Sequence, residues 1–265
     1  MSATKIYLLI GLFIQLSTSI SFAFRPFRTE DAGITPIGFF SVELGNEFSK
    51  TDDGKDNVTT FALTYGLLDW IETEIDFAFL ILRPDSGKNE FGFGDTVILS
   101  KFKILGEKGV LHVDDLFPDM VIRPSVLLPT GDEDKGTGSG QIELGILLVI
   151  EKTFWKFAAR ANLGYLASND PTFDENFEDR FFYGFQIDLP LFIEKLSLGT
   201  ELTGQFASGE GSPLFSLTGL VFQITENIVL DGGVELGLKD AGSAVTAIVG
   251  ITFGFNPFEE FLTNR

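Results

Sequence analysis

The sequence predicts an all-β fold: a transmembrane antiparallel up-and-down β-barrel of about twelve strands, preceded by a signal peptide. Three observations lead to this prediction. Phe and Gly each occur 29 times among 265 residues, although the net charge is -19. Segments of about ten residues alternate apolar and polar side chains through most of the chain. The connections between these segments alternate between short turns and long polar loops, as they do in membrane barrels.

The composition excludes several classes of protein. Because 38 acidic residues outweigh 19 basic ones, the chain lacks the basic surface that binds phosphates, and we expect no nucleic-acid partner. The absence of cysteine excludes a disulfide framework, a Cys-ligated zinc site and a thiol nucleophile. A single histidine, His112, leaves little scope for His-based catalysis or a multi-His metal site. We therefore expect no enzymatic activity, no metal and no cofactor.

The amino terminus has the organisation of a secretory signal peptide. Lys5 precedes an apolar run over residues 6–16, and Ala23 ends a stretch of small polar residues, so cleavage is expected after residue 23. The apolar run is too short for a spanning helix, which needs about 20 residues. We divide the chain into a signal peptide (1–23), a periplasmic or lumenal segment (24–35), a barrel (36–255) and a tail (256–265).

The first half of the barrel shows the clearest alternation. In the first strand, Val42 and Leu44 flank Glu43. In the second, odd positions from Phe61 to Leu67 are apolar, while even positions from 60 to 66 carry small or hydroxyl side chains. In the third strand the face opposite the apolar residues is ionised, with Glu72 and Glu74 on it. The same period of two predicts the first six strands at 37–48, 57–67, 70–80, 93–105, 119–129 and 140–151.

The second half follows the same rule. In the last strand every odd position from Val245 to Phe255 is apolar. The six strands are predicted at 154–166, 180–190, 196–206, 213–224, 227–238 and 243–255. Alternation is weakest at 119–129 and 213–224, so ten or fourteen strands are also compatible with the pattern.

The connections and the large aromatic residues predict an orientation. Short turns are expected near residues 68–69, 152–153, 193–195 and 225–226, and long loops at 49–56 and 168–179. The connection at 106–118 is an exception, because it is long although it belongs to the end of the barrel with the short turns. Trp70 and Trp155 follow short turns, while Tyr165 and Tyr183 flank a long loop, as in the two aromatic girdles of a membrane barrel. The short turns would then be periplasmic. A soluble β-sandwich or lipocalin-like barrel would instead bury these rings in its core. This alternative is disfavoured, because twelve strands with Phe on one face and carboxylates on the other would leave a soluble barrel inside out.

The face opposite the apolar side chains is expected to line the lumen. The ionisable residues singled out as lining it are Glu43, Glu72, Glu74, Asp76, Asp95, Lys101, Lys103, Arg123, Glu143, Lys156, Arg160, Glu201, Asp231 and Glu235. By the same parity Glu47, Glu151 and Asp188 also face inward. We expect an acidic wall facing a basic cluster, with Glu74 opposite Lys101 and Glu72 opposite Lys103. Such a transverse field would orient polar solutes, although pairs that merely neutralise one another fit the pattern equally well.

Apolar side chains interrupt this charged lumen. By the same parity, the inward residues of three neighbouring strands include Val97, Leu99, Leu127, Leu147 and Val149. This patch would either guide an amphipathic or aromatic solute or seat Phe24 and Phe27 of the amino-terminal segment as a plug.

Four motifs, in order along the chain, resemble a known family. They are FRPFRTEDAG at 24–33, GFGDTVILSKFK at 92–103, LPTGD at 128–132 followed by GSG at 138–140, and IVGITFGF at 248–255. Together they resemble the bacterial outer-membrane proteins grouped as the putative MetA-pathway of phenol degradation family. The resemblance implies an outer-membrane β-barrel with a transport role. The tail after Phe255 departs from it, because such barrels commonly end on the terminal aromatic residue.

The sequence thus predicts a channel or transporter in the outer membrane of a Gram-negative bacterium, for passive passage of small solutes, with amphipathic or aromatic ones as candidates. A structural or adhesion barrel with a plugged lumen is the alternative. The expected partners are outer-membrane lipid and lipopolysaccharide, a small-molecule solute and the barrel-assembly machinery.

Overall fold

The computed structural model describes residues 26–52, 54–85, 87–114, 116–168, 180–193, 195–207, 212–241 and 244–257. The predicted signal peptide at 1–23, Phe24, and residues 258–265 of the predicted tail lie outside the described residues. Within the described part there is no helix long and apolar enough to cross a membrane.

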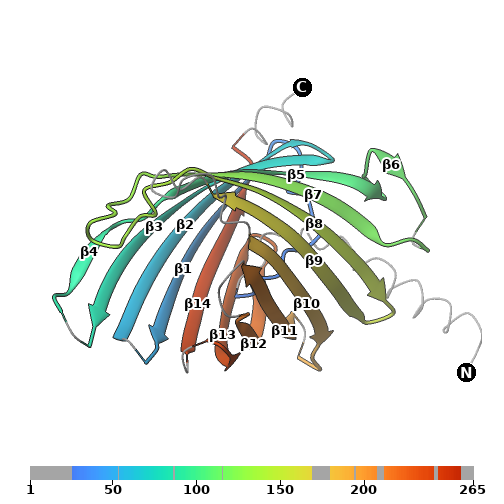
Figure 1. The fold of residues 1–265 in the computed structure, drawn as a ribbon. Coiled ribbons are helices and arrows are strands. Elements are labelled where there is room, and N and C mark those ends of the chain that lie inside the picture. The colour runs from blue at the N-terminus through green and yellow to red at the C-terminus, as the bar shows by residue number, and fades with distance from the viewer. Residues whose placement is uncertain are drawn as a thin grey trace, which may run out of the picture.

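Twelve antiparallel strands close into one barrel (Figure 1). Closure is complete because β1 pairs with β14 along its whole length, from Phe40 opposite Phe255 to Lys50 opposite Val245. The elements are β1 (Phe40–Lys50), β2 (Gly54–Leu68), β3 (Ile71–Pro84), β4 (Glu90–Phe93), β5 (Thr96–Gly106), β6 (Leu111–His112), β7 (Asp119–Leu128), β8 (Glu143–Phe154), β9 (Phe157–Ser168), β10 (Arg180–Pro190), β11 (Leu196–Ala207), β12 (Leu214–Thr225), β13 (Ile228–Lys239) and β14 (Val245–Phe255).

β4 and β6 do not count as separate strands of the barrel wall. β4 and β5 both pair with β3 and form one strand that is interrupted at Gly94 and Asp95. β6 is a two-residue parallel pairing beside the end of β5. The prediction of an antiparallel barrel with twelve strands is therefore confirmed, and the ten- and fourteen-strand alternatives are excluded.

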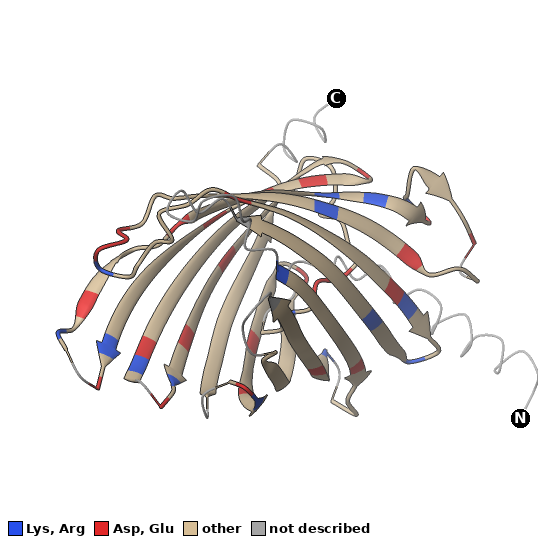
Figure 2. Ribbon diagram, viewed as in Figure 1, with Lys and Arg blue, Asp and Glu red and all other residues tan. Residues whose placement is uncertain are grey.

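The two faces of the wall differ as the alternation predicts. Outward side chains are apolar and exposed, such as Phe48 at 55% and Phe185 at 55%, whereas Glu72 and Glu201 on the inner face are only 4% and 2% exposed. A soluble sandwich would reverse this pattern, because it would bury the aromatic residues. Figure 2 shows charged positions on most strands around the barrel, whereas β12 and β14 carry none.

The connections separate into two ends of the barrel. At the short-turn end, β2 and β3 join through Asp69 and Trp70, and β8 and β9 join through Trp155 and Lys156. The second turn was expected at residues 152–153, but β8 continues to Phe154. The prediction that Lys156 lines the lumen is wrong for this reason: the side chain is exposed in the turn, 5.6 Å from the centre of the Trp155 ring.

The register between β3 and β5 also differs from expectation. Glu72 lies opposite Lys101, and Glu74 lies opposite Leu99, so the pairing is shifted by two residues. A shift of two leaves every side chain on its own face, because the side-chain period of a strand is two. Alternation predicts the faces of these strands correctly and carries no information about this shift.

Candidate functional site

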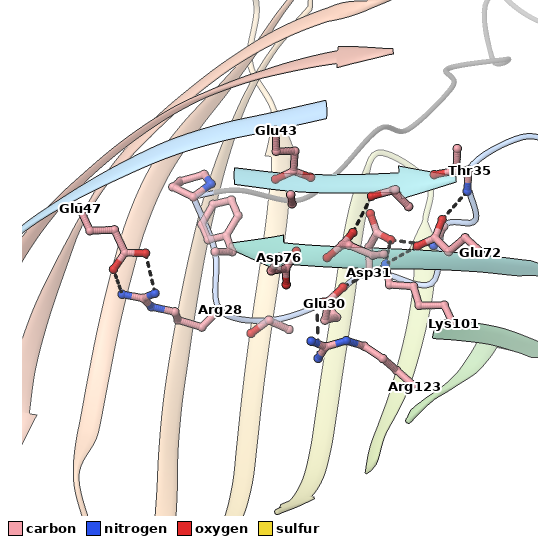
Figure 3. Close-up of a pocket in the computed structure, with 17 residues that line it drawn as sticks. Arg28, Glu30, Asp31, Thr35, Glu43, Glu47, Glu72, Asp76, Lys101 and Arg123 are labelled. Carbon is pink, nitrogen blue, oxygen red and sulfur yellow. Dashed lines mark hydrogen bonds and ion pairs between the residues drawn. The ribbon is translucent and has the colours of Figure 1, made fainter. Parts of the chain in front are cut away.

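Residues 26–35 of the amino-terminal segment cross the interior of the barrel. Arg28 reaches Glu47 on β1 and Glu235 on β13, while Glu30 contacts Lys101 on β5 and Arg123 on β7. These strands lie on different sides of the barrel, so the segment spans the lumen between them, as Figure 3 shows for the labelled side chains. We call residues 26–35 the lumenal segment.

Wall side chains accept hydrogen bonds from the backbone of the lumenal segment. Glu201 accepts from the backbone nitrogens of Arg28 at 2.8 Å and Thr29 at 2.9 Å. Asn162 accepts from the nitrogen of Glu30 at 2.6 Å and donates to its carbonyl at 3.0 Å. An extended segment without a partner strand must find acceptors for its N–H groups, and these inward side chains supply them.

Two further wall carboxylates continue this pattern toward the short-turn end. Glu151 accepts from the nitrogen of Ala32 at 3.2 Å, and Glu72 accepts from the nitrogen of Thr35 at 2.5 Å. Carboxylates are strong acceptors for backbone N–H groups. Part of the acidic excess of the lumen is thus used to bind the chain's own backbone.

The charges of the lumenal segment match the walls that they face. Arg28 makes a two-pronged contact with Glu47, at 2.8 and 2.7 Å, and its Nε lies 3.2 Å from Glu235. On the basic side, the Nζ of Lys101 lies 2.9 Å from Glu30 and 3.4 Å from Asp31. The segment therefore places its cation beside Glu47 and Glu235 and its anions beside Lys101, so each charge lies next to wall charges of opposite sign.

Other predicted lumen residues pair within the wall. Arg160 contacts Glu151 at 2.7 Å and also pairs with Asp188. Arg180 pairs with Glu143, and Asp231 on β13 lies against Gly250 of β14.

Lys103 and Asp95 lie near the ends of the barrel and have other partners. The Nζ of Lys103 lies 2.7 Å from Asp119 at the start of β7, rather than beside Glu72. Asp95, at the break between β4 and β5, accepts from the backbone nitrogens of Gly131 at 2.9 Å and Ser139 at 2.6 Å. Asp95 thereby ties the β7–β8 loop to the start of the neighbouring strand β5.

Two cavities lie in the lumen beside the lumenal segment. The first has a volume of about 170 Å³, and its lining includes Glu43, Glu74 and Asp76 (Figure 3). There the hydroxyl of Thr64 donates to Glu74 at 2.6 Å. The second has a volume of about 390 Å³ and a largely apolar wall. Arg28 and Arg123 line both cavities.

The inward apolar patch only partly seats the lumenal segment. Ala32 packs against Val121, Leu147 and Val149, whereas Val97 and Leu127 face the larger cavity. Phe27 does not lie on this patch, contrary to one of the two expectations. It packs on Leu217 of β12 and Ile248 of β14, an inward apolar pair that the alternation did not single out.

The alternation of apolar and polar residues does not reveal which side chains bind the lumenal segment. Asn162 is uncharged and gave no signal, and Glu47 and Glu151 were recognised only as inward-facing positions. The available signal was the motif at 24–33, whose Arg28 and Glu30 lie between acidic and basic walls. Because the motif precedes the first strand, alternation does not predict where its charged side chains lie.

Substituting Lys101→Met is expected to release the lumenal segment. Lys101 is 8% exposed and its ammonium lies 2.9–3.4 Å from carboxylate oxygens of Glu30, Asp31 and Glu72, so its loss leaves buried acids uncompensated. Breaking such a buried pair costs about 3–5 kcal/mol. Limited proteolysis should then cleave the segment while the barrel still migrates as a folded species, and exposed Lys135→Met is the matched control. Continued protection of the segment in Lys101→Met would contradict this role.

A closed antiparallel barrel with an apolar exterior, a charged lumen and a chain segment across that lumen defines the outer-membrane type of β-barrel fold. The sequence profile described as putative MetA-pathway of phenol degradation matches residues 23–255. The chain belongs to this family, as the four motifs indicated.

Solved structures with a similar fold are known at low sequence identity. The COG4313 outer membrane channel from Pseudomonas putida F1 is 15% identical, with a TM-score of 0.67 over 88% of this chain and 100% of that one. The NanC porin is 10% identical, with a TM-score of 0.56 over 80% and 98% of the two chains. The KdgM porin in complex with disordered oligogalacturonate is 11% identical, with a TM-score of 0.54 over 81% and 99%. No functionally curated protein matches the sequence.

Proposed function

We propose that this protein is an outer-membrane channel for passive passage of small solutes, and that its lumenal segment narrows the channel at rest. The observation that carries the proposal is a closed barrel whose charged interior is crossed by a segment with cavities of about 170 and 390 Å³ beside it. A barrel built only for rigidity has no need of an ionisable interior, because buried charges are costly unless they are paired. Reported channel and porin structures of the same fold support the proposal.

The orientation and partners follow from the two ends of the barrel. We place the short-turn end, with Trp70 and Trp155, in the periplasm and the long loops outside the cell, the arrangement common to such barrels. Outer-membrane lipid and lipopolysaccharide would contact the apolar exterior, and the barrel-assembly machinery would insert the chain. The protein acts without catalysis in this proposal. His112 lies exposed on β6, outside the lumen.

The second candidate is a structural or adhesion barrel with a permanently blocked lumen. The observation that favours it is the density of contacts on the lumenal segment, since Glu201, Asn162, Glu72 and Lys101 all bind it directly.

Liposome swelling separates the two functions. Purified protein in liposomes should admit small neutral sugars faster than protein-free liposomes, because a resting segment that fluctuates in an aqueous lumen lets small solutes pass. The conducting function predicts that the rate falls steeply with sugar size. Protein that leaves liposomes as impermeable as the protein-free control, with the barrel shown to be folded, would favour the blocked barrel.

A further inference from the structure

Arg123 on β7 is a lumen cation whose pairing is loose. Its Nη1 lies 3.6 Å from Glu30, compared with 2.7 Å between Arg28 and Glu47. Glu30 is itself held by Lys101 at 2.9 Å. The Nε of Arg123 is buried, and no described residue offers it a hydrogen-bond acceptor. The Arg123 side chain as a whole is 21% exposed, so its other guanidinium N–H groups remain open to an anionic acceptor in the lumen.

The larger cavity lies directly beside this guanidinium. Arg123 lines the cavity of about 390 Å³, whose apolar wall includes Val97, Leu127, Leu147 and Phe182. The other charged groups that line it already have close partners: Glu143 pairs with Arg180, and Arg28 is bound by Glu47 and Glu235. The cavity therefore combines one loosely paired guanidinium with a largely apolar surface.

We propose that this cavity is a binding subsite for monoanionic solutes with an apolar body, such as aromatic or short aliphatic carboxylates. The carboxylate accepts from the guanidinium of Arg123, and the hydrocarbon part packs against Leu127, Leu147 and Phe182. This proposal rests on the proposed channel function and names the class of solute.

The same geometry disfavours other solutes. A neutral apolar molecule would offer no acceptor to the guanidinium of Arg123, and an organic cation would place its charge beside that of the guanidinium. A sugar would place hydroxyl groups against the apolar wall of Leu127 and Phe182, where few partners are available.

Three matched probes test the subsite on the purified full chain: phenylbutyrate, phenylbutanol and phenylbutylamine, with calorimetric titration. They share one apolar part and differ only in the head group. Phenylbutyrate should bind about tenfold more tightly than the alcohol, because a charge-assisted hydrogen bond is gained, and the amine should bind most weakly. Arg123→Gln should abolish the preference for the acid.

Two further variants separate the subsite from other effects. Leu127→Gln alters the apolar wall without touching a contact of the lumenal segment, and it should weaken binding of all three probes. Lys135→Gln, on an exposed loop, should change nothing. Equal binding of the three probes, or a preference for the acid that survives in Arg123→Gln, would overturn the subsite. Because sugar-driven swelling tests the channel separately, swelling without acid preference would reject only the subsite, and absence of swelling would reject the channel.

Discussion

Deleting residues 24–33 is expected to raise the single-channel conductance several-fold and to make the pore cation-selective. The deletion removes the part of the chain that spans the lumen between Glu47 and Lys101. It also frees carboxylates such as Glu201, which now accept backbone N–H groups of the segment. Rings of unpaired carboxylates favour cations in a pore. Planar-bilayer recordings across a potassium chloride gradient measure both quantities.

A synthetic peptide of residues 24–35 provides the control for this deletion. Added to the deleted barrel, it should restore the low conductance of the full chain, whereas a scrambled peptide of equal composition should not. The order of charges matters, since Arg28 faces Glu235 and Glu30 faces Lys101. If the deleted barrel conducts no better than the full chain, another part of the protein closes the lumen and the blocked-barrel function gains support.

The strands and their faces could be predicted from the sequence because membrane barrels impose a strict period of two. Lipid excludes polar groups from one face, and an aqueous lumen tolerates them on the other. This constraint places Glu43, Glu72 and Glu201 inside and Phe48 outside; the three glutamates are 6%, 4% and 2% exposed, and Phe48 is 55% exposed. Among the inward apolar residues, Leu217 and Ile248 did not stand out in the alternation; they are 1% and 2% exposed, and Phe27 packs on them.

The partners of the lumen side chains could not be predicted in the same way. A register shift of two residues keeps every face correct, so alternation cannot distinguish Glu74 from Glu72 opposite Lys101. The sequence pattern encodes the ends of strands as weakly as it encodes their register. Alternation placed Lys156 inside the barrel, but the chain turns at Trp155, which has a positive φ of 54°.

Two of the family motifs, which lie apart in the sequence, contact each other in the structure. The GFGD motif interrupts the strand formed by β4 and β5, and its Asp95 binds the backbone of Gly131 and Ser139. These glycine and serine residues belong to the LPTGD and GSG motifs of the β7–β8 loop. The sequence reveals both motifs, but their contact depends on strand pairing across the wall, which no local pattern encodes.

Gly66→Ala is expected to expel the lumenal segment from a barrel that remains folded. Gly66 lies on β2, where a Cβ would overlap the carbonyl oxygens of Thr35 and Pro36 and lie 2.7 Å from the carbonyl carbon of Pro36. β2 is paired with both β1 and β3, so the wall cannot yield and the segment must move. Conductance should rise toward that of the deleted barrel.

Accessibility of Thr29 reports this displacement independently of conductance. The natural chain has 0 cysteines, so Thr29→Cys introduces a single thiol, at a position that is 1% exposed. A maleimide should label it slowly in the otherwise natural chain and rapidly when Gly66→Ala is added. Gly232→Ala is the matched control, because a Cβ there comes no closer than 3.4 Å to another residue's atoms. Slow labelling in Gly66→Ala would mean that the segment adapts within the lumen, and that its hydrogen bonds to Glu201 and Asn162 outweigh the clash at its entrance.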